Sequence, residues 1–366
     1  MLTLDTLRSH AIARTLFAPT SLLRAIRKLG FVQADPMRAP ARAQDLTLRH
    51  RVKGYVAGDL ERRYPTLGLE EDFFINHGFL RREHHALMHP RAPRSVWSAA
   101  TRRRAEALLA FVRERGCVHP REVDAHFAHG RATNAWGGSS NATTHLLDAM
   151  HYRGLLRVVR RDGGVRIYAA RDASTVVPAE LSDAQRLDAL VDLAVQAYAP
   201  LPATSLAKLV HRLRIGAPQW AGDRADALAR AKARLGHARV DGVDWYWPAP
   251  ERPLRAALQQ LADEPAVRLL APFDPLVWDR HRFELFWGWA YRFEAYTPAP
   301  KRLRGHYALP LLWRDQVIGW GNLAVAGGQL RAELGYVSGR APREAAFRPA
   351  LAAELQRMRV FLGLPH

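Results

Sequence analysis

One order of predicted elements constrains the fold more than any other feature of this chain. Between residues 101 and 172, helical patterns are predicted for 101–115, from about 121, and for about 141–152. Two alternating runs follow, 155–160 and 165–169, and they flank Asp162-Gly163-Gly164, a turn sequence typical of a β-hairpin. Three helices followed by a hairpin is the order of a winged helix.

The same order recurs between residues 182 and 249, although the two stretches share no letter-by-letter repeat. Helices are predicted for 187–197, 206–213 and 224–235, and Gly236 ends the third. A shorter hairpin over 239–247 turns at Asp241-Gly242. The repetition predicts tandem winged-helix units, each a helix-turn-helix with a β-hairpin wing.

The two ends of the chain complete the expected organisation. The first 90 residues open with helical periodicity, and Phe31 to Gln33 read as a short strand or extended turn before Pro36. From residue 267 the chain consists of short aromatic runs (269–273, 291–296, 306–310 and 316–323), with a closing helix at 342–362. The expected fold class is α+β, with winged-helix units at 1–95, 96–175 and 180–250 and a C-terminal small antiparallel β-domain at 265–366.

Composition bears on partners and on location. Lys and Arg number 54 against 35 Asp and Glu, a net charge of +19 that favours double-stranded DNA as the partner. An Arg-rich, Lys-poor balance also arises from a GC-rich genome, so charge alone does not decide. The single Cys117 excludes an internal disulfide and is expected to be a small buried residue. With no secretory signal and no long apolar stretch, we expect no membrane contact and a cytoplasmic, nucleoid-associated protein.

The sequence predicts neither a metal site nor a cofactor. His84, His85 and His89 lie close together, but no acidic residue or cysteine accompanies them at a recognised ligand spacing. Glycine patterns of Walker or Rossmann type are missing from the sequence as well. We therefore expect a chain that works with no metal and no small-molecule cofactor.

Two stretches carry a resemblance to a known family. Residues 29–36 read Leu-Gly-Phe-Val-Gln-Ala-Asp-Pro and continue through Arg38 and Arg42 to Leu46, while residues 270–280 read Leu-Ala-Pro-Phe-Asp-Pro-Leu-Val-Trp-Asp-Arg and are followed by related residues at 291–302. Together they resemble the YcaQ/AlkZ-type interstrand-crosslink DNA glycosylases over nearly the full chain. The resemblance implies three winged-helix units, a small β-domain, and a Gln-apolar-Asp catalytic motif, which is Gln33-Ala34-Asp35 here. Arg81 stands where the family usually has Pro, a difference that bears on substrate preference more than on chemistry.

The implied activity is that of a monofunctional DNA glycosylase acting on alkylated purines, including those in interstrand crosslinks. Cleavage of the N-glycosidic bond gives the sugar oxocarbenium character, so the Asp35 carboxylate would stabilise the cation and activate water, which Gln33 would position. In the alternative, Asp35 is an ordinary helix N-cap with Pro36 at the first helical position. For the second Asp-Pro pair, Asp274-Pro275, we favour the structural interpretation, and Asp279 is expected to pair with Arg280.

Basic residues supply the expected DNA contacts. Those nearest the motif are Arg38 and Arg42, and those on or beside the predicted wing are Arg153, Arg157, Arg160 and Arg161. Arginines on a wing are suited to contact phosphates, although some charged residues only solvate a surface. A non-enzymatic winged-helix transcriptional regulator is the alternative function.

Overall fold

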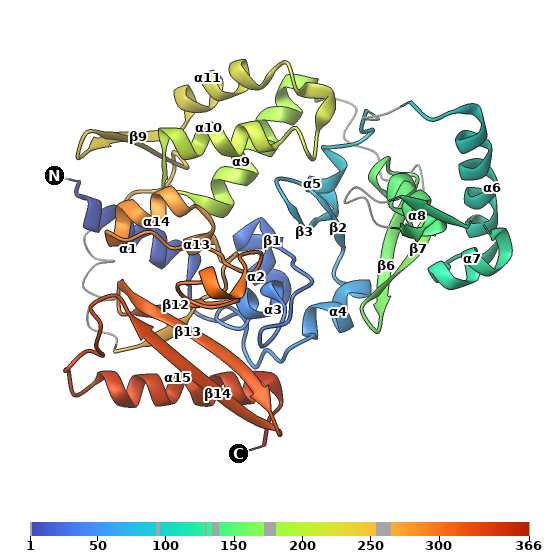
Figure 1. Ribbon diagram of the computed structural model, residues 1–366. Coiled ribbons are helices and arrows are strands. Elements are labelled where there is room, and N and C mark those ends of the chain that lie inside the picture. Colours follow the sequence, from blue (N-terminus) through green and yellow to red (C-terminus); the bar gives the residue numbers. More distant parts are fainter. Residues whose placement is uncertain are drawn as a thin grey trace. The chain divides into compact units, whose positions relative to one another are not determined.

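The computed structural model describes residues 2–92, 96–128, 130–133, 139–171, 181–253 and 265–365. Contacts divide the chain into two compact units: unit 1 contains residues 1–59, 192–209 and 228–366, and unit 2 contains residues 60–191 and 210–227. Figure 1 follows the element order, which mixes helices with antiparallel sheets. The chain is therefore an α+β protein, as predicted.

Unit 1 begins with the segment that carries Gln33 and Asp35. Its elements are α1 (Leu4–Thr15), α2 (Leu22–Leu29), β1 (Phe31–Gln33) and α3 (Ala43–Leu48). Gly30 ends α2 at φ 74°, and a Cβ there would lie 2.8 Å from Leu193 Cδ1, so only glycine fits this turn. The turn leads directly into β1.

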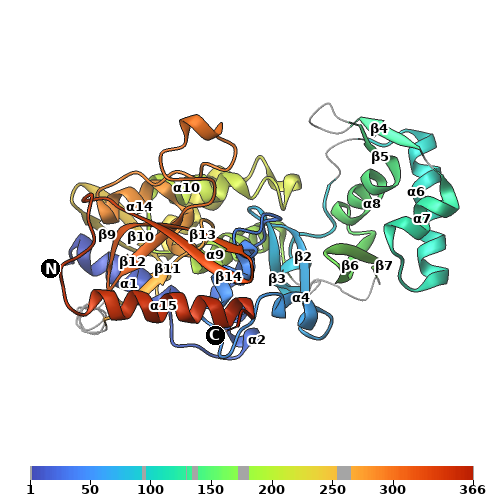
Figure 2. The same ribbon diagram turned by 60° about the horizontal axis from the view of Figure 1, so that its bottom comes forward.

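A four-stranded antiparallel sheet forms the C-terminal part of unit 1. Its strands, in spatial order, are β11 (Val267–Leu269), β12 (Leu309–Trp313), β13 (Gln316–Ala326) and β14 (Gln329–Tyr336). Helix α15 (Phe347–Leu362) runs along this sheet (Figure 2) and packs on β11. The expected closing helix is confirmed, although it begins five residues later than predicted.

Part of the C-terminal prediction is wrong. Residues 275–287 form two helices, α13 (Pro275–Trp278) and α14 (Arg280–Trp287), and residues 291–296 contain no strand. The aromatic residues of this region pack on one another, as in the Phe283–Trp289 contact at 5.0 Å between ring centroids. The aromatic pattern that suggested strands in this region therefore reflects side chains that are buried against one another.

Unit 2 contains α4 (Asp59–Arg63), the 3-10 turn Tyr64–Thr66, and a hairpin of β2 (Leu69–Phe73) and β3 (His77–Arg81). After α5 (Arg82–Ala86) come α6 (Ala99–Arg115), α7 (Pro120–Phe127), the short pair β4 (Arg131–Thr133) and β5 (Ser139–Asn141), and α8 (Ala142–Tyr152). The hairpin of β6 (Leu156–Asp162) and β7 (Val165–Ala170) follows. The predicted order of three helices and a hairpin is present, together with a short strand pair that the sequence did not reveal.

The second predicted helix–hairpin series is also present. Its elements are α9 (Asp183–Tyr198), β8 (Leu201–Pro202), α10 (Ala203–Arg212), α11 (Arg224–Arg234), β9 (Gly236–Val240) and β10 (Val243–Trp247). Asp241 and Gly242 turn the hairpin with φ values of 49° and 78°. Strand β8 pairs with β10, so the sheet has three strands rather than the predicted two. The predicted boundary residues 175–180 lie outside the described residues.

Candidate active site

Gln33 and Asp35 lie where β1 passes into an irregular loop. Gln33 is the last residue of the strand, and Asp35 follows two residues later; both side chains are half-buried. Phe31 and Val32, which precede them, are about 1% exposed and anchor the strand in the core. The two buried residues of β1 thus fix the position of the half-buried Gln33 and Asp35.

Asp35 does not cap a helix. The main-chain N–H of Met37 donates to Asp35 Oδ1 at 2.9 Å, which closes a turn two residues long, and the next helix, α3, begins only at Ala43 with Arg42 at its N-cap. The N-cap interpretation of Asp35-Pro36 is therefore wrong. One carboxylate oxygen shapes the loop, and no hydrogen bond to Oδ2 is seen within the described residues.

Helix α3 holds the loop in place through Gln44. The Gln44 side chain is 2% exposed, and its Oε1 accepts from the Asp35 main-chain N–H at 3.3 Å. The adjacent Asp45 is also buried and accepts from Tyr55 Oη at 2.7 Å and from the Gly58 N–H. Gln44 therefore fixes the backbone at the candidate carboxylate, whereas Asp45 ties α3 to residues 55 and 58.

The surroundings of Asp35 disfavour its charged form. Burial raises the pKa of Asp35 above its ordinary value, and the hydrogen bond from Met37 offsets only part of that effect. Asp35 in turn acts on Tyr307: burial, and then the charge of Asp35, raise the pKa of the Tyr307 hydroxyl. Tyr307 is 3% exposed, and its hydroxyl has no hydrogen-bond partner among the described residues. Sequence reasoning missed Tyr307, because nothing in the local pattern links it to residue 35.

The second Asp-Pro pair is structural, as favoured from the sequence. Asp274 caps α13 by accepting from the Leu276 N–H, and it forms two hydrogen bonds with Arg51, at 2.8 and 2.9 Å. Both side chains are 0% exposed. The expected pairing of Asp279 with Arg280 is wrong: Asp279 caps α14, whereas Arg280 donates to main-chain oxygens of Val277 and Pro272.

The predicted DNA-contact arginines separate into two groups. Arg38 and Arg160 are exposed, and Arg160 pairs with the equally exposed Asp162 at 3.1 Å. Arg153 is partly exposed and lies 3.9 Å from the centre of the Trp97 ring. Arg42 is half-buried at the N-cap of α3. These four side chains leave charge at or near the surface.

Arg157 and Arg161 instead engage buried carboxylates. Arg157 Nη2 lies 3.0 Å from Glu70 Oε1, and Arg161 Nε donates to Glu71 Oε2 at 2.8 Å. Glu70 and Glu71 are each 1% exposed. Burial opposes ionisation of Glu71, but hydrogen bonds from His77 and Arg161 and the charge of Arg166 outweigh it and hold the Glu71 pKa well below its usual range. Each of these two arginines therefore pairs with a buried carboxylate, while its own side chain stays 26% exposed for Arg157 and 17% for Arg161.

Arg81, which the resemblance places where proline is usual, has a φ value that proline could also adopt. It ends β3 and precedes α5 with φ −68°, the value that proline requires, and its side chain pairs with Glu83. The helix that follows can therefore start as it would after proline. Compared with proline, arginine adds a positively charged side chain at this position.

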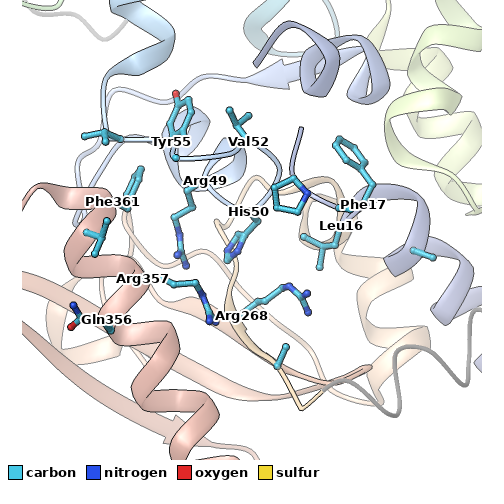
Figure 3. A pocket seen from close by; sticks show the side chains of 17 residues that line it. Leu16, Phe17, Arg49, His50, Val52, Tyr55, Arg268, Gln356, Arg357 and Phe361 are labelled. Atoms are coloured by element: carbon cyan, nitrogen blue, oxygen red, sulfur yellow. The ribbon is translucent and has the colours of Figure 1, made fainter. Parts of the chain in front are cut away.

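Unit 1 also contains a pocket of about 780 Å³ beside α15 (Figure 3). Leu16, Phe17 and Tyr55 give it apolar walls, while Arg49 and Arg357 both bond to the buried Glu354. Neither Gln33 nor Asp35 lines this pocket. This pocket is therefore not part of the candidate catalytic site.

Two expectations about unit 2 need correction. Cys117 is exposed rather than buried, and its Sγ accepts a long hydrogen bond of 3.5 Å from Arg160. The histidines of residues 84–89 do have an acidic neighbour, because the β2–β3 hairpin brings Asp72 against His85 and His89. The argument from ligand spacing failed here, since the carboxylate comes from a separate strand.

The fold and the site define a class: a strongly basic α+β protein in which a glutamine ends a core strand and a half-buried carboxylate follows two residues later. The sequence matches the family described as DNA glycosylase AlkZ-like over residues 26–361. The chain belongs to this AlkZ-like DNA glycosylase family. The structure is also similar to that of Streptomyces sahachiroi DNA glycosylase AlkZ, with a TM-score of 0.61 and 14% identity over 99% of this chain and 97% of that one.

These comparisons confirm the family predicted from the two sequence stretches. They support a DNA glycosylase that repairs crosslinked or alkylated DNA, and they do not favour the non-enzymatic regulator. DNA follows as the substrate. Within the described ranges, every helix is too short or too polar to cross a membrane.

Proposed function

We propose that the chain is a monofunctional glycosylase that hydrolyses the N-glycosidic bond of alkylated purines, including purines in interstrand crosslinks. One observation carries the proposal: Asp35 is held half-buried, with a raised pKa, two residues after Gln33 at the end of a core strand. A desolvated carboxylate interacts strongly with a developing cation, because little water screens it. It is also a stronger base than an exposed one.

The reaction follows from these two groups. An N7- or N3-alkylated purine is cationic, so the C1′–N bond breaks with its electron pair going to the base, which needs no proton from an acid. Asp35 stabilises the oxocarbenium character of the sugar and takes a proton from the attacking water, whose oxygen bonds to C1′. Gln33 is neutral and positions that water. Gln44 is a positioning residue, because it holds the Asp35 backbone.

Tyr307 is a further candidate within this site. A buried hydroxyl that has no partner among the described residues costs stability, so the position of Tyr307, within the electrostatic influence of Asp35, needs a reason. We assign it the role of donating a hydrogen bond to the water or the sugar when DNA is bound. This role is consistent with the electrostatic effect of Asp35 on Tyr307.

We further propose that the helix–hairpin series of α6–α8 with β6–β7, and of α9–α11 with β9–β10, act as winged helices that bind duplex DNA. Support comes from the element order and from the tight turns of both hairpins. The phosphate contacts are assigned to the four surface arginines, Arg38, Arg42, Arg153 and Arg160. We place the protein in the cytoplasm with the nucleoid, where its substrate is found.

Base release decides between this proposal and a DNA-binding regulator. Enzyme in excess is incubated with an N7-alkylguanine duplex and with a crosslinked duplex, and free base is followed over time by chromatography. The proposal predicts exponential release that a chelator does not abolish. Salt-sensitive binding without release from either duplex would support the regulator instead.

A further inference from the structure

Three chemically distinctive side chains of unit 2, none of them part of the candidate catalytic pair, lie close to one another. Asp72 comes from β2, His85 from α5, and His89 from the turn after α5. Asp72 is 0% and His85 1% exposed, and the side chain of His89 is 12% exposed. One ligand atom from each residue lies within 4.8 Å of the other two.

The distances among these atoms match those around a tetrahedral metal ion. His85 Nε2 lies 2.8 Å from Asp72 Oδ2 and 3.1 Å from His89 Nε2, and His89 Nε2 lies 3.5 Å from the same oxygen. Ligands about 2.0–2.1 Å from a tetrahedral Zn²⁺ are separated from each other by about 3.3–3.4 Å. The three atoms therefore approximate one face of such a tetrahedron.

Hydrogen bonding alone satisfies this cluster poorly. If His85 Nε2 carries a proton and donates it to Asp72, the same nitrogen has no lone pair with which to accept from His89. If it carries none, its contact with the carboxylate places two acceptors 2.8 Å apart. A cation accepts electron density from both nitrogens and from the oxygen at once, so all three contacts become favourable.

Neighbouring residues keep the cluster in this arrangement. Gly154 adopts φ 79°, and a Cβ there would lie 2.6 Å from His89 Nδ1, so glycine leaves the space that this ring occupies. Arg91 Nη2 lies 3.1 Å from Asp72 Oδ2, and its Nε donates to the Gly216 main-chain oxygen. The guanidinium of Arg91 fixes the carboxylate but also weakens attraction for a second cation.

We propose that Asp72, His85 and His89 bind a divalent transition-metal ion, Zn²⁺ being the best match, at a three-ligand site that joins β2 to the segment after α5. Two imidazoles and a carboxylate are ligands suited to this ion, and a fourth position is left for water. The site is separate from the glycosylase chemistry, which uses Gln33 and Asp35.

The test uses the full chain, stripped with a chelator, dialysed and titrated with ZnCl₂ alone and with CoCl₂ alone. We expect one equivalent of metal by elemental analysis, a visible Co²⁺ spectrum typical of tetrahedral coordination, and a melting temperature that rises with Zn²⁺ concentration. His89→Gln removes one ligand and should lower the affinity by at least 10-fold. His84→Gln is the matched control, because it changes a neighbouring histidine outside the cluster.

Equal binding by His89→Gln, His84→Gln and the wild type would overturn the proposal, and so would the absence of stoichiometric binding by the wild type. If His89→Gln does not fold, His85→Asn provides the second ligand variant, and the Co²⁺ spectrum of the wild type remains decisive. None of these outcomes depends on base release, so failure here leaves the proposed function standing.

Discussion

Replacing Arg51 with methionine should destabilise unit 1 strongly without touching the chemistry. The variant keeps much of the aliphatic bulk but leaves the Asp274 carboxyl 0% exposed, without the two hydrogen bonds from Arg51 at 2.8 and 2.9 Å. Main-chain oxygens of Thr15 and Thr47 also lose a donor. Breaking one side of such a buried pair costs about 3–5 kcal/mol.

For a unit of this size, that cost corresponds to a melting temperature lower by about 6–20 °C. Differential scanning calorimetry of wild type, Arg51→Met, Asp274→Asn and the double variant measures the loss of stability in each variant and the interaction free energy between the two residues. The double variant should lose less than the sum of the two single variants, because neither charge remains unpaired. At a temperature where Arg51→Met is folded, it should release bases at the wild-type rate. A shift below 2 °C for Arg51→Met would refute the reasoning.

Three further predictions follow from the same structure. Tyr307→Phe should melt at or above the wild-type temperature, because the hydroxyl finds no partner in the described part of the chain, yet release bases about 3- to 30-fold more slowly; an unchanged rate would remove Tyr307 from the site. Burial opposes ionisation of Glu251, but hydrogen bonds from His10 and Arg14 lower its pKa to about 2. The ionised carboxylate therefore stabilises the folded protein fully above the ordinary pKa of glutamate, and this stabilisation is lost as the pH falls toward 2. The urea midpoint of Glu251→Gln should fall less steeply with acid than that of the wild type, and parallel plots of midpoint against pH would contradict this. Arg160→Ala should reduce the salt dependence of DNA binding, whereas Arg161→Ala should mainly lower the melting temperature because it removes one of the cationic partners of the buried Glu71; the reverse pattern in filter binding and melting would be inconsistent with our assignment of the two residues.

Local sequence predicted the helix–hairpin series well, and for a physical reason. Helical periodicity and Asp-Gly turns act within a few residues, and both hairpins turn where those residues stand. The C-terminal helices α13 and α14 were missed because their aromatic residues also suit strands. Short strands such as β8 were missed because two residues carry no periodicity.

The residues of the candidate site likewise include some that local sequence predicts and some that it does not. Gln33 and Asp35 are close in sequence, so a short motif could identify them. Tyr307 and the Asp72–His85–His89 cluster were not predictable, because tertiary contacts and a hairpin bring their members together. The partners of Arg157 and Arg161 lie 87 and 90 residues away, so their ion pairs with buried carboxylates could not be predicted from local sequence.

The most direct test of the central claim is single-turnover base release by Asp35→Asn. Asparagine keeps the size of the side chain and can still accept from the Met37 N–H, but it removes the charge. We predict release at least about 10²-fold slower than wild type, with unchanged melting temperature and with DNA affinity equal or slightly higher. Gln33→Ala should lose less. Equal release rates for Asp35→Asn and wild type at saturating enzyme would contradict the assignment of Asp35.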